Sequence, residues 1–233
     1  MFKIYGVAVS VHTRKVIVAA RFKGLAYELV PAVPVVPGQV PPNWRQLSPS
    51  GTIPVLQDGE YVLADSAAIC AYLERRQPAA ALYPAGDRAF AQALWFEQYA
   101  GGTLFREVVH PLFHQVFVNP NVRQVPTDPA VVAQVLDGAM PEAYGYLDSV
   151  AGHDFLAGPK LSVADLSVVS NLVTAHYIGF GLDRGRYPRL AALFDRVLRV
   201  PAMAQALQAE RPVVQQMGLS SRVLDGLPVP APH

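Results

Sequence analysis

Two motifs in the first third of the chain place polar groups where they could bind a small ligand. The sequence GTIPVL occupies residues 51–56, and Asp65 and Ser66 then open an apolar helical segment. Free N–H groups at a helix N-terminus bind a carboxylate, and an adjacent aspartate can hold an ammonium. The pair therefore suits the α-amino acid end of a ligand. Its alternative interpretation is a plain helix N-cap.

The Ile53–Pro54 bond precedes a predicted strand and is compatible with a cis peptide, although a trans bond is the ordinary outcome there. A cis bond would turn the Ile53 N–H and C=O outward, where they could pair with an extended peptide ligand. Ser10 stands between the first predicted strand and the first predicted helix, so its hydroxyl could donate to a thiolate near the helix N-terminus. The alternative is that Ser10 or Thr13 only caps that helix.

A third motif, GPKLSVADL at residues 158–166, has a structural meaning. Ser162 and Asp165 have the spacing of a capping box, and Leu161 and Leu166 occupy the two positions of a hydrophobic staple. The motif predicts the start of a buried helix and indicates no chemistry.

The elements that position the first two motifs alternate in type. A strand, a helix and a strand predict a parallel pair with a right-handed crossover, and Asp58-Gly59 predicts a hairpin between two more strands. The uncharged, proline-rich residues 31–44 exclude a central strand or a long helix and predict an extended loop. The predicted strands are residues 2–5, 26–30, 54–57 and 61–64, and the predicted helices are residues 12–23 and 66–76.

Strand signals largely vanish after a linker at residues 77–87, which contains two prolines and a glycine. A long helical pattern follows, with kinks expected at Gly101-Gly102 and at Pro111. The predicted helices of this second part are residues 88–118, 128–150, 162–178, 188–198 and 201–210.

Three parts are therefore expected in the chain. Residues 1–80 should form an α/β domain, residues 88–218 an all-α helical domain, and the proline-rich residues 219–233 an extended tail.

Composition limits the possible functions. The 233 residues carry a net charge of +1, with basic residues scattered, so neither nucleic acid nor an acidic membrane is an expected partner. Cys70 is the only cysteine, which excludes an internal disulfide or a CxxC pair, and its apolar surroundings predict a core thiol. No membrane-length apolar run and no signal-peptide pattern is present, so we expect a soluble, cytoplasmic protein.

Together the motifs resemble those of the cytosolic glutathione transferases, over residues 2–212. The resemblance rests on the proline motif SGTIPVL, the helix start DSAAI and the late capping box SVAD. It implies a thioredoxin-like domain followed by an all-α helical domain, glutathione as co-substrate, no metal, and a homodimer. The helix start TRKV resembles that of the serine-type plant and bacterial classes.

The resemblance also implies roles for individual residues. Ile53 and Pro54 would pair with the cysteinyl backbone of glutathione, and Asp65 and Ser66 would hold its γ-glutamyl end. Ser10 would stabilise the thiolate, with Thr13 and Tyr5 as competing hydroxyls. Many relatives bind the glycyl carboxylate with a basic residue, but residues 31–44 carry no charge. The remaining donors for that carboxylate are Gln39, Trp44 and Arg45.

A small hydrophobic electrophile should bind where the long helix faces the first domain. The alternative is that this apolar stripe is ordinary core. His110 and His114 are four residues apart, but no third ligand is apparent and no metal is expected. The predicted wall consists of Leu104, Phe105, Val109, Phe113 and Phe117, with Val7, Ala8 and His12 opposite.

The first hypothesis is thus a glutathione transferase. The second is a specialised glutathione-dependent isomerase, dehalogenase or peroxidase with similar thiolate chemistry. The third is a non-catalytic ligand-binding protein of the same fold, and the uncharged loop at residues 31–44 is its main support.

Overall fold

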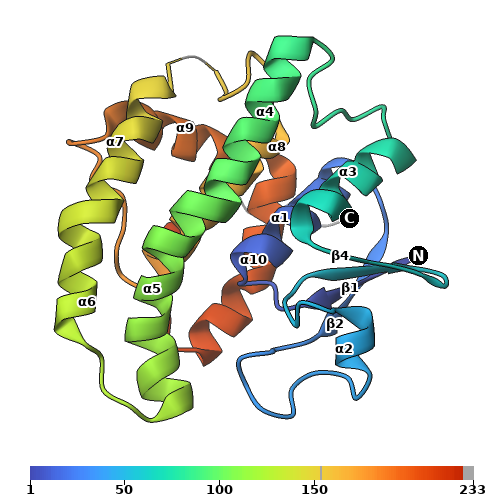
Figure 1. Cartoon of the computed structure of the whole chain (residues 1–233). Helices are drawn as coiled ribbons and strands as arrows, with labels where there is room; N and C mark the ends of the chain where they lie inside the picture. The colour runs from blue at the N-terminus through green and yellow to red at the C-terminus, as the bar shows by residue number, and fades with distance from the viewer. Residues whose placement is uncertain (153, 228–233) are drawn as a thin grey trace.

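A four-stranded mixed sheet forms the first part of the computed structural model, which describes residues 1–152 and 154–227 (Figure 1). The strand order is β2-β1-β3-β4, with β1 parallel to β2 and antiparallel to β3, and β3 antiparallel to β4. The predicted parallel pair and the predicted hairpin are therefore both present. The strands are β1 (Phe2–Gly6), β2 (Tyr27–Pro31), β3 (Val55–Asp58) and β4 (Tyr61–Ala64).

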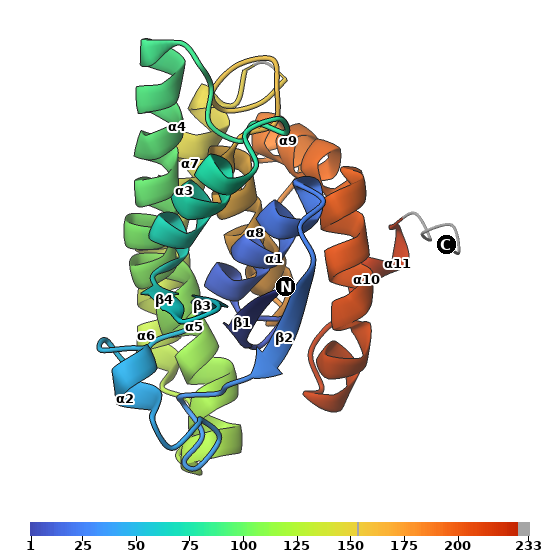
Figure 2. The ribbon, with the colours of Figure 1, turned by 90° about the vertical axis from the view of Figure 1, so that its right-hand side faces the viewer.

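Side chains alternate across the sheet and give it two buried faces. Ile4 and Leu56 belong to the main core, whereas Val55 lies in a smaller cluster on the other face with Trp44. Figure 2 shows α2 on the opposite side of the strands from α1 and α3. The helices of this part are α1 (Val11–Phe22), α2 (Trp44–Leu47) and α3 (Ser66–Arg76).

The loop predicted at residues 31–44 contains turns and no long helix, but α2 begins at its end. This single turn was not predicted because it is too short to show helical periodicity.

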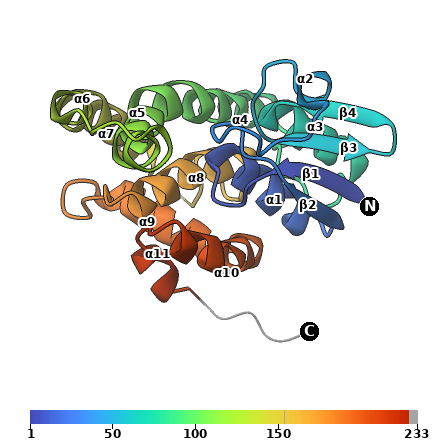
Figure 3. The same ribbon diagram turned by 90° about the horizontal axis from the view of Figure 1, so that it is seen from below.

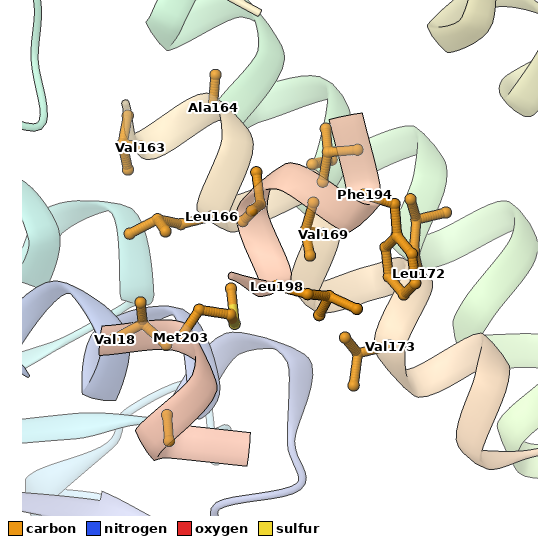
Figure 4. Packing of buried hydrophobic residues seen from close by; sticks show 14 of the residues in the cluster. Val18, Val163, Ala164, Leu166, Val169, Leu172, Val173, Phe194, Leu198 and Met203 are labelled. Carbon is orange, nitrogen blue, oxygen red and sulfur yellow. The ribbon is translucent and has the colours of Figure 1, made fainter. Parts of the chain in front are cut away.

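The second part is all helical and packs around α8, which is buried on all sides. Figure 4 shows Leu172 of α8 in one cluster with Phe194 and Leu198. The capping box of Ser162 and Asp165 is present at the start of α8, as predicted. No helix of the described residues has the length and apolar character needed to cross a membrane. The helices are α4 (Asp87–Tyr99), α5 (His110–Phe113), α6 (Pro129–Gln134), α7 (Met140–Val150), α8 (Val163–Tyr177), α9 (Pro188–Leu198), α10 (Pro201–Gln216) and α11 (Arg222–Asp225).

Three π-helical segments, η1 (Ala100–Val109), η2 (His114–Arg123) and η3 (Val135–Ala139), interrupt the α-helical ones. A proline lies inside η2, at Pro120, and two residues after the end of each of the other two, at Pro111 and Pro141. Proline lacks the N–H of the helical ladder and its ring crowds the preceding turn, and a wider π turn accommodates it. Kinks were predicted at Gly101-Gly102 and Pro111, and what the structure has at these places is a change of helical winding.

The prediction of an extended tail is wrong for Arg222–Asp225, which form α11. Leu224 is fully buried and Leu227 nearly so, and this apolar anchoring explains the short helix. Residues 228–233 of the predicted tail lie outside the described residues. The boundaries at residues 80, 88 and 218 stay predictions.

A fully buried guanidinium joins the two parts. Arg14 of α1 donates five hydrogen bonds, two of them to the carboxylate of Glu210 in α10. The other three reach the carbonyls of Val9 and Ser170 and the hydroxyl of Thr174. Each donor is satisfied, so the buried charge is tolerated only in this assembled arrangement.

Arg14→Met should lower the free energy of unfolding by roughly 3–5 kcal/mol, because it leaves the buried Glu210 carboxylate without its cation. The matched control is Arg184→Met, whose exposed pair with Asp195 should cost about 1 kcal/mol or less. Urea denaturation of both variants measures the difference. Equal losses would mean that burial does not set the strength of the Arg14 pair.

Candidate functional site

Three loops meet at one end of the sheet. Val55, the first residue of β3, pairs with both Tyr5 of β1 and Ala64 of β4. Pro54 and Asp65 are the next residues beyond this row, and the chain after β1 leaves the sheet at the same end and leads to Ser10. The register therefore brings the two predicted ligand motifs together.

Ser10 is the N-cap residue of α1, but its side chain makes no capping hydrogen bond. Its backbone is fixed, because its N–H donates to Val7 O at 3.0 Å and its C=O accepts from Arg14 N at 2.8 Å. The hydroxyl is half-buried, and no acidic residue lies in the first turn of α1. The N-terminus of α1 is therefore open to an anion, with the Ser10 hydroxyl beside it.

The two competing hydroxyls are differently placed. Thr13 is fully buried against Gly6, and its Oγ1 has no partner among the described residues. The Tyr5 hydroxyl donates to Gln57 Oε1 at 2.7 Å. Of the three, Ser10 alone combines partial exposure with a hydroxyl that has no partner among the described residues.

Asp65 closes the N-terminus of α3. Its Oδ1 accepts from Ala67 N at 2.8 Å and from Ala68 N at 3.0 Å, so the N-cap interpretation of this residue holds. This corrects the expectation of several free N–H groups at this helix end, because the cap takes two of them and leaves that of Ser66. Asp65 is exposed, and Oδ2 makes no hydrogen bond with the described residues, so the carboxylate can still receive a cation.

Asp65 has φ 79° and ψ 126°, a conformation that non-glycine residues rarely adopt. Such backbone strain persists where surrounding structure holds it and is common at binding sites. Here the strain aims the carboxylate at the turn of α3 while the chain leaves β4.

The Ile53–Pro54 bond is cis. Among the described residues no hydrogen bond uses the Ile53 N–H, which remains available. The preceding loop is held by Ser48 Oγ, which donates to Thr52 O at 2.7 Å, and by the Trp44 indole, which donates to Gly51 O at 3.2 Å.

These contacts distinguish the three candidate donors for the carboxylate at the far end of a ligand. Trp44 is buried and its indole N–H is occupied by the Gly51 carbonyl. Arg45 lies directly against Gly51, where an added Cβ would be 2.8 Å from its Nη1. Gln39 is exposed on its loop, and no side-chain contact places it near Ile53. Arg45 is therefore the donor that the structure places beside the proline loop, a residue that the sequence ranked no higher than Gln39.

His12 connects the two helix ends. Its Nδ1 lies 3.5 Å from the hydroxyl of Ser66, which is buried, and its ring meets Phe105 edge-on at 4.4 Å. Burial, and then the charge of Lys15, lower the pKa of His12 to about 4, against the opposing effect of Asp65. The imidazole is therefore neutral at physiological pH and acts as a hydrogen-bonding and packing group.

The wall of the long helix differs from the predicted one. Leu104 and Val109 are buried in the core, so neither presents a surface to a ligand. In a π helix residues i and i+5 lie on one face. The ring centroids of Phe105 and His110 are accordingly 5.5 Å apart, and those of His110 and His114 are 4.2 Å apart. The 3.6-residue period assumed from the sequence selected Val109 instead of His110. Phe113 and Phe117 stack at 5.2 Å, and Phe113, Phe117, Val7 and Ala8 are all half-buried.

The histidine pair and the cysteine are the other residues whose chemistry the sequence suggested. The described residues contain no cluster of three or more histidine, cysteine, aspartate or glutamate side chains that could hold a metal, and the rings of His110 and His114 lie against each other at an interplanar angle of 36°. Burial raises the pKa of the Cys70 thiol to about 12, so this residue is a packed core thiol.

Comparisons with known proteins agree with this geometry. Family models of the N-terminal and C-terminal domains of glutathione S-transferase match residues 4–81 and 110–210. Glutathione S-transferase 3 of Zea mays is 28% identical over 232 residues, which cover 99% of this chain and 96% of that protein.

Two solved structures extend the comparison. Glutathione transferase E6 from Drosophila melanogaster superimposes with a TM-score of 0.78 at 25% identity, covering 98% of this chain and 100% of that one. A glutathione S-transferase-I bound with lactoylglutathione has a TM-score of 0.75 at 24% identity, covering 88% of this chain and 97% of that one.

The fold is thus a thioredoxin-like domain followed by an all-α helical domain, with a candidate small-ligand site at the N-terminus of α1. The two domain models together cover most of the chain, so the protein belongs to the glutathione S-transferase family.

The π register of η1 makes a testable prediction about this wall. Val109→Ala should lower the free energy of unfolding by about 2 kcal/mol, because it removes buried methyl groups, and should leave KM for an electrophile nearly unchanged. His110→Ala, at an exposed position, should leave stability within about 0.5 kcal/mol and alter that KM. Denaturation and steady-state kinetics of both variants show which residue faces the ligand. An altered KM in Val109→Ala with an unchanged KM in His110→Ala would support the wall expected from an α-helical period.

Proposed function

We propose that the chain is a glutathione transferase that holds glutathione as its thiolate for attack on small hydrophobic electrophiles. The observation that carries the proposal is the unpartnered Ser10 hydroxyl at the uncapped N-terminus of α1. A hydrogen bond donor and a helix dipole at that point both favour the charged form of a thiol. Membership of the family supports glutathione as the thiol.

In this reaction the thiol gives its proton to solvent and the thiolate sulfur accepts the Ser10 hydroxyl hydrogen bond. The sulfur then forms a bond to an electrophilic carbon, and the leaving group departs with the electrons of the bond that breaks. An electrophile with an activated double bond would instead receive a proton at the neighbouring carbon. No metal takes part in this scheme.

The remaining groups would bind glutathione along its length. The Ile53 N–H and C=O, next to Pro54, would pair with the cysteinyl backbone as an added strand. Asp65 would hold the γ-glutamyl ammonium, with the Ser66 N–H and hydroxyl on the carboxylate. Arg45, whose guanidinium lies against Gly51, would serve the glycyl carboxylate together with the neutral amide of Gln39.

The electrophile would lie between Phe105, His110 and His12, with Phe113 and Phe117 further along the helix. A specialised isomerase, dehalogenase or peroxidase would use the same thiolate. The uncharged residues 31–44 favour a non-catalytic ligand-binding protein as the second candidate function. A cytoplasmic homodimer, usual for the family, belongs to the same proposal.

Calorimetric titration with reduced glutathione at two pH values flanking the thiol pKa tests the proposal. Binding with proton release near neutral pH is expected, because the site should favour thiolate. Ser10→Ala should reduce glutathione-dependent kcat/KM by about 10- to 100-fold, the loss of one hydrogen bond to a charged group, with an unchanged Tm.

The matched control is Thr13→Val, which removes the buried hydroxyl without a partner and should leave both turnover and Tm at least as high. Loss of turnover in Thr13→Val with none in Ser10→Ala would reassign the thiolate donor. Absence of binding at millimolar glutathione would favour the ligand-binding protein.

Asp65 and Asp128 are both exposed aspartates that cap helices, at α3 and α6. Asp65→Ala and Asp128→Ala should each cost about 1 kcal/mol of stability through the lost cap. Only Asp65→Ala should also raise KM for glutathione, by at least tenfold, because it removes the partner of the γ-glutamyl ammonium. Equal KM values in the two variants would exclude Asp65 from the binding site.

A further inference from the structure

The imidazole of His12 contacts both halves of the candidate site. His12 lies in the first turn of α1, two residues after Ser10. Its Nδ1 is 3.5 Å from the hydroxyl of Ser66 at the start of α3, and its ring centroid is 4.4 Å from that of Phe105 in η1. Figure 3 shows α1 at the junction between the strands of the first part and α8 of the second. One side chain thus links the proposed glutathione position to the proposed electrophile position.

The ring of His12 has a single proton to place. Burial, and then the charge of Lys15, lower the pKa of His12 to about 4, so the neutral imidazole carries one N–H, on Nδ1 or on Nε2. The ring also packs against the backbone of η1, since a Cβ added at Gly101 would lie 3.8 Å from its Cε1. The hydrogen bonds open to the two nitrogens then determine which of them holds the proton.

The surroundings of the ring favour the proton on Nδ1. Nε2 makes no hydrogen bond with the described residues, so an N–H placed there would lack an acceptor among them. On Nδ1 the same N–H can donate to Ser66 Oγ, because a hydroxyl accepts as well as donates. Unpaired buried donors are rarer in proteins than unpaired buried acceptors. The Nδ1–H tautomer is therefore the one that the contacts of His12 support.

The direction of this hydrogen bond decides what the Ser66 hydroxyl can offer a ligand. When Oγ accepts from His12, its own O–H is free to donate to a carboxylate at the start of α3. When Oγ donates to His12 instead, it presents only lone pairs to that carboxylate. The difference matters at this helix end because Asp65 already occupies the N–H groups of Ala67 and Ala68.

We propose that His12 is a positioning residue for both substrates. Its Nδ1–H donates to Ser66 Oγ and so leaves the Ser66 O–H for the γ-glutamyl carboxylate, while its ring holds Phe105 in the wall that faces the electrophile. The identity of these ligands rests on the proposed function, but the tautomer is a property of the ligand-free protein. The contact of 3.5 Å is long for a hydrogen bond, and such contacts shorten when substrate closes a site.

The first test is NMR of the full-length, ligand-free protein with isotope-labelled histidine nitrogens. The chain has 6 histidines, and the loss of one set of signals in His12→Asn assigns those of His12. We expect the Nδ1–H tautomer near neutral pH, and a shift toward Nε2–H in Ser66→Ala, which removes the acceptor. An Nε2–H tautomer in the parent protein, or a tautomer ratio unaffected by Ser66→Ala, overturns the proposal whether or not glutathione binds.

The second test uses two substitutions that separate the two contacts of His12. His12→Phe keeps a ring against Phe105 and removes the N–H, so it should raise KM for glutathione by roughly tenfold or more. Ser66→Ala should raise that KM to a similar extent, and the double variant should raise it no further, because both changes remove one hydrogen bond. His12→Asn keeps an N–H near the place of Nδ1 and removes the ring, so it should raise KM for the electrophile and largely preserve KM for glutathione.

His176 provides the matched control for loss of a buried imidazole. Burial, and then the charge of Arg184, lower the pKa of His176 to about 4, and its ring stacks on Phe194 outside the candidate site. Its Nε2 accepts from Leu182 N at 3.2 Å, so His176→Phe should lower Tm. Both KM values should stay unchanged in this variant, because lower stability alone does not move a substrate contact.

Two kinetic results would contradict the proposal. Equal rises of both KM values in His12→Phe and His12→Asn would make His12 a packing residue only. Independent, additive effects of His12→Phe and Ser66→Ala would show that the two side chains do not act through one hydrogen bond. If the parent protein does not bind glutathione, the proposed function fails, and the tautomer of the ligand-free protein still decides the direction of the His12–Ser66 hydrogen bond.

Discussion

The buried guanidinium of Arg14 holds the first helix to the helical part of the chain and uses all five of its donors. One of them reaches the Val9 carbonyl, directly before Ser10, and two reach Glu210 in α10. A buried charge without partners is costly. The turn that presents the Ser10 hydroxyl therefore adopts its observed conformation only when α1, α8 and α10 are all in place. The geometry of the candidate site is thus determined partly by elements that never approach the ligand.

The two helix N-termini beside that turn differ in their capping. Asp65 fills the end of α3 with its own carboxylate, whereas Ser10 leaves the end of α1 open. An anion entering the site therefore meets an unneutralised dipole at α1 only, and a cation meets the unused oxygen of Asp65. The Ser10 side of the site therefore favours an anion, and the Asp65 carboxylate favours a cation.

Features set by local spacing could be predicted from the sequence. The strands, the hairpin at Gly59 and the capping box at Ser162 all depend on near neighbours, and each is present. The prediction wrongly placed Val109 in the wall of the ligand site. Prolines further along induce π winding, and this winding shifts the faces of the helix. The partners of Arg14 depend on tertiary contacts that no spacing reveals, and α2 and α11 are too short to show a period.

The Arg14–Glu210 pair also has a consequence for biosynthesis. The two residues are 196 positions apart, so the cation leaves the ribosome long before its carboxylate exists. At about 5–20 residues per second the delay is roughly 10–40 s. During that interval α1 cannot bury its guanidinium favourably and keeps it in water. The contacts that fix α1 against α10 therefore form only after almost the whole chain has been synthesised.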